Sequence, residues 1–489
     1  MKNLTLRHIA EACGGILHEK NNSGELEVQA IVTDSRQAGP GALFAAVKGE
    51  RVDGHSFIPA VFAQGALCVL TEHDLEEPDQ TGREMIARKS AEPDQTGQES
   101  NRDRQNQPGS WIRVISTLQA LKDIAEYYLM QLNIPVVGIT GSVGKTSTKE
   151  MVASVLSQKY RTLKTQGNFN NELGLPLTVF RLREEDEIAV LEMGISDFGE
   201  MHRLAKIARP DTCIITNIGQ CHLEFLGDRD GILRAKTEIF DFLKANGHII
   251  LNGDDDKLMT IQNVNGITPV YFGIYQKPSI YADEIESRGL KGISCRIHTP
   301  EGAFGALIPI PGVHMVYNAL AGTAAGLTYG LTLEEIKAGI ESLQPLSGRF
   351  HIIETSDYIV IDDCYNANPV SMKASLEVLQ DGLGRKVAIL GDMGELGENE
   401  TALHEEVGSF VASCRIDKLI SVGPLCGKLA EKAKEGNPSL EVTAYDTLDA
   451  LLANLQNEIK KGDTILVKAS HFMQFPKVVE ALQTKNAVD

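Results

Sequence analysis

The sequence predicts an α/β protein of three domains, and three observations lead to that prediction. The chain has 489 residues, which at ~150 residues per domain corresponds to about three domains. Apolar strands alternate with amphipathic helices in two long stretches, a pattern typical of mainly parallel sheets with crossover helices. A glycine-rich turn follows an early strand of the first stretch. We therefore expect a small N-terminal α/β domain, a central mainly parallel sheet and a C-terminal Rossmann-like, doubly wound sheet.

Composition and charge exclude several classes of protein. Lys and Arg total 47 against 66 Asp and Glu, a net charge of −19, and an acidic protein is repelled by nucleic acid and by anionic membranes. No apolar run approaches the ~18–20 residues that cross a bilayer, and the first residues lack the apolar core of a signal peptide. The eight cysteines are scattered without a C-x-x-C pair, so we expect neither a disulfide framework nor a zinc ribbon.

These features predict a cytoplasmic protein that binds neither nucleic acid nor membrane. A monomer is expected, because no heptad pattern and no large apolar surface stripe is evident in the sequence.

Residues 1–110 form the predicted N-terminal domain. A helix is expected over 5–13, with short strands over 28–32 and 42–47. Residues 74–110 are polar, nearly free of large apolar side chains, and contain the hexapeptide EPDQTG twice. Such a segment cannot bury enough apolar surface to offset its ordering entropy. It is therefore interpreted as a flexible surface insertion.

Residues 111–347 and 348–489 form the predicted central and C-terminal domains. Central strands are expected at 136–139, 189–192, 213–217 and 248–251, and central helices at 117–132, 145–158, 230–243 and 314–329. Short strand-like runs with Gly and Pro turns predict some antiparallel sheet over 267–312. After the sequence PLSGR a new alternation begins, with strands expected at 358–361, 387–390, 418–422 and 464–467.

The strongest local signal is the run VVGITGSVGKTS at residues 136–147. Its glycines permit sharp turns that aim backbone N–H groups at phosphate oxygens, and the helix that follows adds partial positive charge. Lys145 can reach the β- and γ-phosphates, and the hydroxyl of Thr146 can bind Mg²⁺. The predicted nucleotide-binding set is Thr140, Gly141, Ser142, Val143, Gly144, Lys145, Thr146 and Ser147. An isoleucine replaces the first glycine of G-x-x-x-x-G-K-[ST], but strand, turn, Lys-Thr and helix together predict a P-loop ATPase-type domain.

Two further runs offer partners for this loop. The run GNFNNELGLP supplies Asn168, Asn170 and Asn171, whose neutral amides suit a polar substrate near phosphates. The alternative is an Asn-rich turn, because Asn tolerates left-handed backbone. Glu192 ends an apolar strand, where a parallel sheet presents ligand-facing residues, and is a candidate Mg²⁺ ligand. The alternative is an ordinary strand-end glutamate.

His222 and Lys236 follow in the same domain. His222 leaves the next strand and could bind a second divalent ion through a neutral imidazole, although a lone histidine is more often structural. Lys236 lies on an amphipathic helix, where a surface or salt-bridging lysine is the ordinary interpretation. The loop alone leaves the reaction open, because GTPases, kinases, motor ATPases and ligases all use it.

The motifs taken together resemble the Mur ligase family. They are TGSVGKTSTKEM, QGNFNNELGLPLT, LEMGISDFGE, TNIGQCHLEFLG, RAKTEIF, PGVHMVYNALA, SGRF and DDCYNANPVSMKASL, with TDSR and PGALFAAVKGERVDGHSFI in the first domain. The resemblance covers nearly the whole chain except residues 74–110. Within the family, the run DCYNANPVSM resembles the branch that adds D-alanyl-D-alanine.

The resemblance implies residues for ATP and for two Mg²⁺ ions. Thr146 and Glu192 would bind one Mg²⁺ and His222 a second, and Lys236 aligns with a lysine that family members carry as a carbamate. On this basis the catalytic residues are Lys145, Glu192, His222 and Lys236. For the nucleotide, the resemblance implies that Lys145 contacts the phosphates, Asn318 meets the adenine side, Arg349 reaches the nucleotide across the domain boundary and Asp363 holds ribose hydroxyls.

The resemblance also implies the other substrates. UDP-MurNAc-tripeptide would meet the first domain, and D-alanyl-D-alanine would be joined to it through an acyl phosphate during peptidoglycan synthesis. The implied contacts with the UDP-sugar are Thr33, Asp34, Ser35, Arg36, Asp53, Gly54 and His55. Asn366 and Asn368 would lie at the substrate-facing mouth of the last domain.

One departure and several alternatives accompany this interpretation. The family's C-terminal motif K-G-S-R reads Lys468-Ala-Ser-His471 here. A histidine thus replaces an arginine, whose guanidinium is always charged and donates hydrogen bonds in a fork-shaped geometry. Another Mur ligase or folylpolyglutamate synthase would share the architecture. A P-loop switch or transport ATPase would hydrolyse nucleotide without forming a covalent product, and a nucleotide-binding scaffold would have no turnover.

Overall fold

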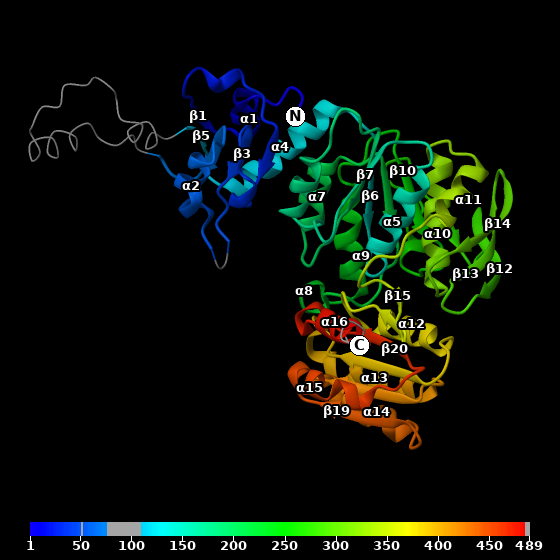
Figure 1. The fold of residues 1–489 in the computed structure, drawn as a ribbon. Coiled ribbons are helices and arrows are strands. Elements are labelled where there is room, and N and C mark those ends of the chain that lie inside the picture. The colour runs from blue at the N-terminus through cyan, green and yellow to red at the C-terminus, as the bar shows by residue number, and fades with distance from the viewer. Residues whose placement is uncertain (50–51, 76–108, 485–489) are drawn as a thin grey trace, which may run out of the picture. The chain divides into compact units, whose positions relative to one another are not determined.

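The computed structural model describes residues 1–49, 52–75 and 109–484 (Figure 1). The chain divides into two compact units. The first unit holds residues 1–135, 165–189 and 206–208, and the second holds 136–164, 190–205 and the chain from 209 onward. Both copies of EPDQTG, and with them most of the predicted insertion, lie outside the described residues.

The first unit contains a five-stranded sheet of order β1-β5-β4-β3-β2. Its strands are β1 (Ile16–His18), β2 (Ala30–Val32), β3 (Ala42–Ala45), β4 (Cys68–Thr71) and β5 (Ser110–Arg113), and its helices are α1 (Leu6–Cys13), α2 (Ile58–Ala63), α4 (Thr117–Leu132) and α6 (Gly174–Val179). β1 runs antiparallel to β5, and the remaining neighbours are parallel. Because β5 pairs between β1 and β4, the first sheet extends three residues beyond the boundary predicted at residue 110.

Local sequence explains where the first helix begins. The hydroxyl of Thr5 accepts a hydrogen bond from the N–H of His8 at 3.2 Å, so α1 begins at Leu6 with Thr5 as its N-cap. Gly14 ends the helix with a φ of +62°, a left-handed conformation that glycine adopts without strain.

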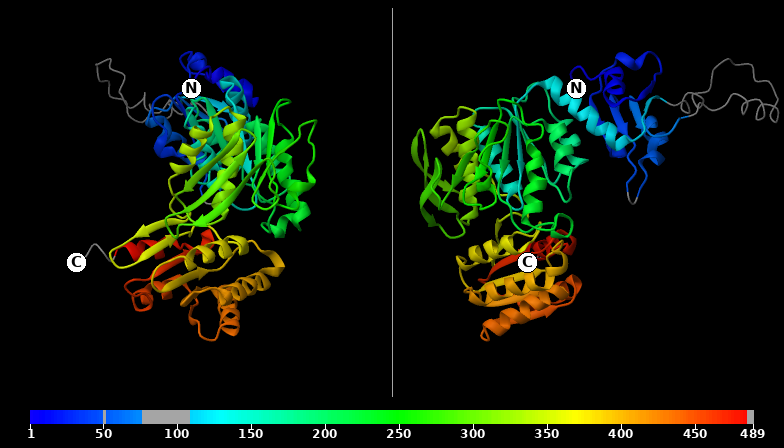
Figure 2. Two further views of the ribbon diagram at one scale, coloured as in Figure 1. Left: turned by 90° about the vertical axis from the view of Figure 1, so that its right-hand side faces the viewer. Right: turned by 180° about the vertical axis from the view of Figure 1, so that it is seen from behind.

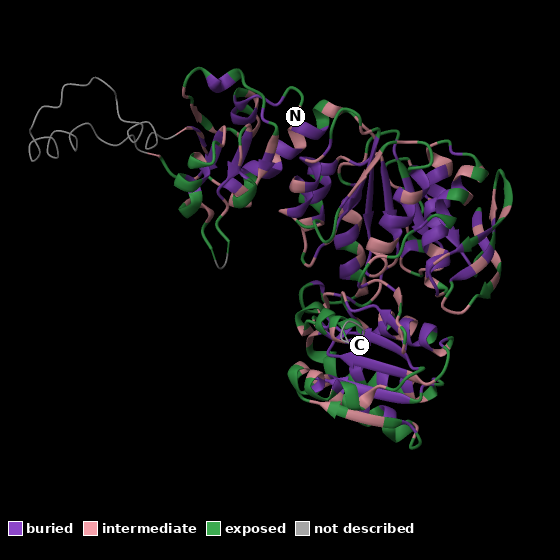
Figure 3. Ribbon diagram, viewed as in Figure 1, coloured by how far each residue is buried: buried purple, intermediate pink, exposed green. Residues whose placement is uncertain are grey.

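The second unit contains a nine-stranded sheet of order β14-β13-β12-β11-β10-β9-β6-β8-β7. Its strands are β6 (Val136–Thr140), β7 (Thr162–Lys164), β8 (Ile188–Glu192), β9 (Thr212–Ile215), β10 (His248–Asn252), β11 (Val270–Gly273), β12 (Ile280–Ser287), β13 (Ile293–Thr299) and β14 (Gly302–Ile308). The sheet is parallel from β6 through β9, β10 and β11 to β12. The pairings of β12 with β13 and of β13 with β14 are antiparallel. The antiparallel sheet predicted between residues 267 and 312 is therefore confirmed. Every residue of β6, β8 and β9 is buried (Figure 3).

Several helices accompany this sheet. They are α5 (Lys145–Leu156), α7 (Glu200–Ala208), α8 (Leu223–Leu226), α9 (Arg229–Thr237), α10 (His314–Thr328) and α11 (Leu333–Glu341). α5 packs against both α10 and α11 (Figure 1). A Cβ on Gly339 would lie 2.4 Å from the Cα of Val155, so glycine permits this close approach of α11 to α5.

The last part of the chain forms a six-stranded sheet of order β15-β16-β20-β17-β18-β19. Its strands are β15 (His351–Glu354), β16 (Ile359–Asp362), β17 (Lys386–Gly391), β18 (Lys418–Val422), β19 (Glu441–Tyr445) and β20 (Thr464–Lys468), and its helices are α12 (Pro369–Gln380), α13 (Glu400–Ser413), α14 (Pro424–Gly436), α15 (Leu448–Glu458) and α16 (Pro476–Thr484). β15 is antiparallel, and the other five strands are parallel.

Helices cover both faces of this sheet (Figures 1 and 2). Leu451 and Leu455 of α15 and Val478 of α16 share a core with strand residues on one face, while α12 and α14 pack against the strands as well. β20 lies between β16 and β17, which places the last strand at the centre of the sheet. Three sheets of mainly parallel strands confirm the predicted α/β class, and this sheet confirms the doubly wound C-terminal part.

Candidate active site

The glycine-rich turn predicted to bind phosphate connects β6 to α5. Gly141 has a φ of +151° and Gly144 a φ of +83°, and α5 begins at Lys145. A Cβ on Gly141 would lie 1.9 Å from the hydroxyl oxygen of Thr216, so no other residue fits there. The turn is therefore shaped by glycines at the two positions that the sequence indicated.

Thr216 and Asn217 hold the middle of this turn. The N–H of Val143 donates to Oδ1 of Asn217 at 3.0 Å, and the carbonyl of Val143 accepts from the Asn217 amide at 2.9 Å and from the Thr216 hydroxyl at 2.6 Å. The N–H of Ser142 donates to the carbonyl of Asn217 at 3.0 Å. These two N–H groups are thus already engaged within the protein. The N–H groups of the first turn of α5, which have no helical acceptors, remain as phosphate donors.

Lys145, Thr146 and Glu192 lie together at the carboxyl ends of β6 and β8. The Lys145 amine donates to the carbonyl of Gly141 at 2.8 Å, and the Thr146 hydroxyl donates to Oε1 of Glu192 at 3.2 Å. The buried amine of Lys149 lies 3.8 Å from Oε2 of Glu192 and 3.0 Å from Oε1 of Glu150. A carboxylate and a hydroxyl therefore stand side by side beside the phosphate loop.

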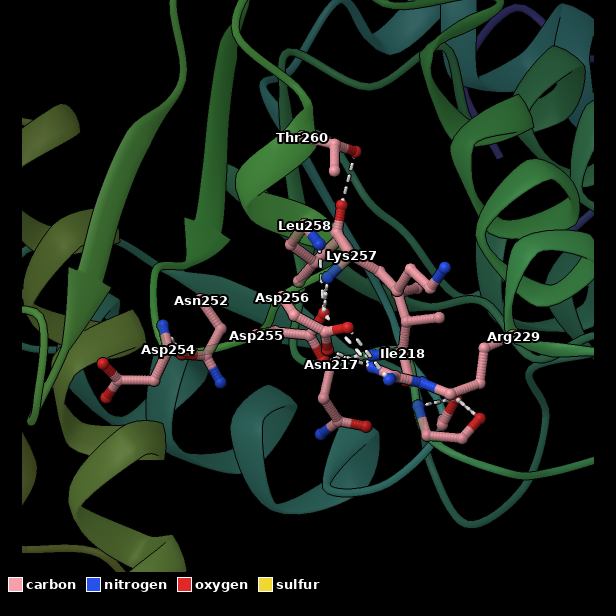
Figure 4. Close-up of polar contacts among 12 residues, drawn as sticks. Asn217, Ile218, Arg229, Asn252, Asp254, Asp255, Asp256, Lys257, Leu258 and Thr260 are labelled. Atoms are coloured by element: carbon pink, nitrogen blue, oxygen red, sulfur yellow. Dashed lines mark hydrogen bonds and ion pairs between the residues drawn. The ribbon is translucent and has the colours of Figure 1, made fainter.

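Asp255 anchors the segment that holds the turn. Its carboxylate accepts from the N–H of Ile218 at 2.8 Å and from the N–H groups of Lys257 and Leu258 at 3.0 Å each (Figure 4). Arg229, the first residue of α9, donates to the carbonyl of Ile218 at 2.8 Å. This network links the Asn217 segment to the end of β10 and to the helix that carries Lys236.

Replacing Asp255 by alanine should weaken both the fold and nucleotide binding. The change leaves three N–H groups without their acceptor, which costs about 2 kcal/mol of unfolding free energy, and it frees the segment that holds Val143. Urea unfolding and the affinity for ADP measure the two effects. Asp256→Ala is the matched control, because the Asp256 side chain is 69% exposed, against 8% for Asp255, and forms an ion pair with Arg229 at the surface. Equal effects of the two variants would contradict the assignment.

His222 and Lys236 have different surroundings. His222 is the N-cap residue of α8 and has a left-handed conformation, with a φ of +51°, and its Nδ1 lies 2.8 Å from a carboxylate oxygen of Glu395. The neighbouring His222, although partly opposed by burial, lowers the pKa of Glu395. Lys236 is fully buried, and its amine has no hydrogen-bond partner among the described residues. Burial, together with the positive charge of Lys145, lowers the pKa of Lys236 to about 8.

A cavity of 320 Å³ extends from the phosphate loop to the C-terminal sheet. Residues from four regions line it: Val143, Gly144, Ser147 and Thr148 of the loop and α5; Thr216, Asn217, Asn252, Asp254, Asp255 and Phe272 at strand ends; His314, Tyr317 and Asn318 of α10; and Arg349, Phe350, Asp363, Val370, Ser371, Ala374 and Lys468. One end carries backbone and hydroxyl donors, and the walls carry aromatic rings and amides. A nucleotide fits this distribution, with its phosphates at the loop and its nucleoside along the walls.

The predicted nucleotide contacts outside the loop line this cavity. Oδ1 of Asn318 accepts from the Thr148 hydroxyl at 2.8 Å. The guanidinium of Arg349 stacks over the ring of Tyr365 at 4.1 Å and lies 3.5 Å from the Thr146 hydroxyl. These contacts hold Asn318 and Arg349 on the cavity wall before any ligand binds.

Asp363 forms a buried pair that the sequence did not reveal. Its Oδ2 accepts from the Lys468 amine at 2.6 Å and from the Ser375 hydroxyl at 2.7 Å. Burial lowers the pKa of Lys468, and the negative charge of Asp363 opposes that shift. Because β20 lies next to β16, Lys468 at the end of one strand meets Asp363 just beyond the other.

The predicted UDP-sugar residues lie in the first unit. Asp34 caps a short turn and accepts from the N–H and guanidinium of Arg36, whose hydrogen bonds lower the pKa of Asp34 to about 2. Asp53 accepts from the N–H of His55 at 3.0 Å and pairs with its Nδ1 at 2.7 Å. The N–H of Glu72 donates to Nε2 of His55, which makes the neutral ring with a proton on Nδ1 the matching tautomer.

The asparagines predicted at the substrate have local structural contacts. Oδ1 of Asn171 accepts from the N–H groups of Leu173 and Gly174, and Asn168 precedes it in a tight turn. This run belongs to the first unit, whereas the phosphate loop belongs to the second. Asn368 is the N-cap of α12 and forms a capping box with Ser371, while the Asn366 carbonyl accepts from Lys468.

The Thr146 hydroxyl and the Glu192 carboxylate fit a magnesium site whose remaining ligands would include phosphate oxygens. Thr146 and Glu192 provide a hydroxyl and a carboxylate in contact, and Mg²⁺ commonly takes one or two carboxylates with substrate phosphates and water. Among the described residues no three His, Cys, Asp or Glu side chains cluster so as to hold a metal by themselves.

Some residues of the site were not predicted from the sequence. They are Thr216, Asn217, Asp255, Tyr317, Glu395 and Lys468. Thr216 and Asn217 directly follow β9, and Lys468 ends β20, so the rule that strand ends face ligands could have indicated them. Asp255 and Glu395 act through partners far away in sequence, and no local pattern marks them.

Comparison with known proteins agrees with this fold. Models of the Mur ligase family match residues 27–129 (catalytic domain), 139–326 (middle domain) and 348–471 (glutamate ligase domain). The UDP-N-acetylmuramoyl-tripeptide--D-alanyl-D-alanine ligase of Bacillus subtilis is 36% identical over 481 residues, 98% of both chains. The enzyme of that name from Escherichia coli is 33% identical over 490 residues, 99% of both chains.

Solved structures of MurF also resemble this chain. That of Acinetobacter baumannii has a TM-score of 0.84 at 33% identity and 98% coverage of both chains. That of Thermotoga maritima, a complex with ADP, has a TM-score of 0.77 at 28% identity, with 94% of this chain and 99% of that chain covered. The fold and the phosphate-loop site are those of an ATP-dependent ligase. The chain belongs to the Mur ligase family, and within it MurF is the type that it resembles.

Over residues 1–49, 52–75 and 109–484, no helix is long and apolar enough to cross a bilayer.

Proposed function

We propose that this enzyme joins D-alanyl-D-alanine to UDP-MurNAc-tripeptide at the expense of ATP, which gives UDP-MurNAc-pentapeptide for peptidoglycan synthesis. The observation that carries the proposal is similarity over nearly the full length to ligases of that name, in a chain whose phosphate loop is intact. The loop supports use of a nucleoside triphosphate, and the relatives' names supply the two other substrates.

The reaction takes place in two steps. An oxygen of the tripeptide's terminal carboxylate attacks the γ-phosphorus of ATP, the bond to the β-phosphate oxygen breaks, and ADP leaves. The free amine of D-alanyl-D-alanine then attacks the acyl carbon, loses a proton, and expels inorganic phosphate as the amide forms. Activation is needed because a carboxylate repels a nucleophile and offers only oxide as a leaving group.

The chain's own groups stabilise the charge that develops. Lys145 leaves the carbonyl of Gly141 and pairs with phosphate oxygens, and the N–H groups of the first turn of α5 donate to them. Arg349, held over Tyr365 and 3.5 Å from the Thr146 hydroxyl, adds a second cation. Asn318 meets the adenine side of the nucleotide, and Asp363, held by Lys468 and Ser375, accepts from ribose hydroxyls.

Two Mg²⁺ ions are part of this proposal. Thr146 and Glu192 would hold one, and His222 a second, with a carbamate of Lys236 contributing oxygen to the site. When bound, these ions would neutralise negative charge on the transferred phosphoryl group. Lys236 suits carbamate formation because its lowered pKa leaves much of the amine neutral near pH 8, and only the neutral amine adds to CO₂.

The remaining assignments concern domains and location. Residues 1–110 would bind the UDP-sugar through the segments 33–36 and 53–55, 111–347 would bind ATP, and 348–489 would bring the dipeptide near Asn366 and Asn368. Asn168, Asn170 and Asn171 would meet the polar part of the muramyl peptide. Since ATP and nucleotide-activated sugars are cytoplasmic metabolites, we place the reaction in the cytoplasm, and we expect a monomer.

Phosphate release tests the proposal. The protein with ATP and Mg²⁺ should release phosphate rapidly only when UDP-MurNAc-tripeptide and D-alanyl-D-alanine are both present, with one amide formed per phosphate. Release that ignores both compounds would instead support a switch or transport ATPase. Parallel assays use a tripeptide whose third residue is lysine and one whose third residue is another diamino acid.

A further inference from the structure

One wall of the 320 Å³ cavity contains a tyrosine paired with a carboxylate. Tyr317 of α10 and Asp254, two residues after β10, both line the cavity, and the hydroxyl of Tyr317 donates to Oδ2 of Asp254 at 2.9 Å. Phe272 and Asn252 line the same wall. The cations that line the cavity, Arg349 and Lys468, come from the C-terminal part of the chain. This wall therefore suits the neutral base of a nucleotide.

The carboxylate of Asp254 is held by the backbone of the segment that follows β11. It accepts from the N–H groups of Ile274 at 2.6 Å, Gln276 at 2.9 Å and Tyr275 at 3.1 Å, in addition to the Tyr317 hydroxyl. Oδ2 accepts from Ile274, Tyr275 and Tyr317, and Oδ1 accepts from Gln276 and, at 3.2 Å, from the same Tyr275 N–H. Figure 4 shows the Asp254 side chain directed away from those of Asp255 and Asp256. Asp254 consequently has a fixed position.

This arrangement fixes which way the Tyr317 hydroxyl can bond. Its one proton is committed to Asp254, so its oxygen can only accept from a ligand. Burial, followed by the hydrogen bond to Asp254, raises the pKa of Tyr317, and the hydroxyl stays protonated under all ordinary conditions. The cavity wall thus presents an acceptor that cannot turn into a donor.

We propose that Tyr317, oriented by Asp254, selects adenine by accepting a hydrogen bond from its 6-amino group. Hypoxanthine and guanine carry a carbonyl oxygen at the same position, and two acceptors facing each other leave both unsatisfied. Asp254 is a positioning residue, because it acts through the tyrosine. The inference deepens the proposed function, since it rests on the use of ATP by this site.

Direct binding of nucleoside diphosphates tests the inference without turnover. ADP and inosine diphosphate, which differ at the 6-position, compete against a fluorescent ADP analogue on the full chain. The unmodified protein should bind ADP about tenfold more tightly than inosine diphosphate, since one hydrogen bond to the partly buried Tyr317 oxygen is worth about 1.4 kcal/mol. In Tyr317→Phe the preference for ADP over inosine diphosphate should fall about tenfold. ADP loses its hydrogen bond to the tyrosine oxygen, and inosine diphosphate loses the repulsion between that oxygen and its own carbonyl.

A matched control and a second set of ligands keep the test decisive. Tyr329→Phe removes a hydroxyl that contacts the Thr212 hydroxyl at 3.0 Å and does not line the cavity, so the preference should stay unchanged. If Tyr317→Phe fails to fold, the unmodified protein should still rank ADP above purine riboside diphosphate, and that compound above inosine diphosphate. Another order, or a folded Tyr317→Phe protein with full preference, overturns the inference. Binding of no nucleotide by the unmodified protein would overturn the proposed function instead.

Discussion

Lys145→Ala should lower the rate of ligation by about 10³-fold while the protein stays folded. The Lys145 amine is the cation that the phosphate loop itself supplies, and in the structure it rests on the carbonyl of Gly141, from which it can move to a phosphate. The turn keeps its shape without this side chain, because Val143 is held by Thr216 and Asn217. Phosphate release in the presence of all three substrates measures the loss.

A matched control separates the lost contact from a general effect of charge. Lys337→Ala removes a half-exposed lysine of α11 that forms an ion pair with Glu341, one turn along the same helix. Its activity and melting temperature should equal those of the unmodified protein. If Lys145→Ala turned over at the unmodified rate, the role assigned to that amine would be wrong.

Lys236→Ala should have the second largest effect, a loss of about 10²-fold to 10³-fold in turnover. If the amine carries a carbamate, the variant lacks a carboxylate-like group in a space that the shorter side chain leaves open. Formate or acetate at millimolar concentrations should then restore part of the activity. In the unmodified protein, ¹³C-labelled bicarbonate should give a carbamate resonance that the variant lacks.

The pH dependence of that resonance provides a further check. The Lys236 amine has a pKa of about 8 instead of its ordinary 10.5, so its neutral fraction rises as the pH approaches and passes 8. Carbamate formation consumes the neutral amine and releases a proton, and the signal should therefore grow over this range. Lys432→Ala, which changes a half-exposed lysine of α14, is the control for both measurements. Loss of activity that no carboxylate restores, with no resonance in the unmodified protein, would reject the carbamate.

Local sequence patterns predicted the elements that depend on local physics. The helix expected over 117–132 matches α4, and the strand expected over 418–422 matches β18. The phosphate loop was equally visible, because strand, glycines, Lys-Thr and helix are contiguous. The strand expected to run to residue 217 ends at Ile215, since Thr216 and Asn217 leave the sheet to hold Val143. A boundary set by such a distant contact cannot be derived from periodicity.

Other features depend on which strands become neighbours. Nothing near residues 110–113 indicates that β5 lies between β1 and β4, or that β20 lies between β16 and β17. The Asp363–Lys468 pair follows from the second of these placements and was therefore not foreseen. Asn368 is a different case, because an asparagine directly before proline is a recognisable helix start, and that pattern would have predicted its capping role.

The bonds that Val143 makes to Thr216 and Asn217 also bear on how fast the protein can exchange nucleotide. Both backbone groups of this residue have partners within the chain, so contacts within the protein set the shape of the turn. Little conformational entropy is then lost when a triphosphate arrives, and little order is lost when the diphosphate departs. With a preformed turn of this kind, the rate at which the diphosphate dissociates is set by other parts of the molecule.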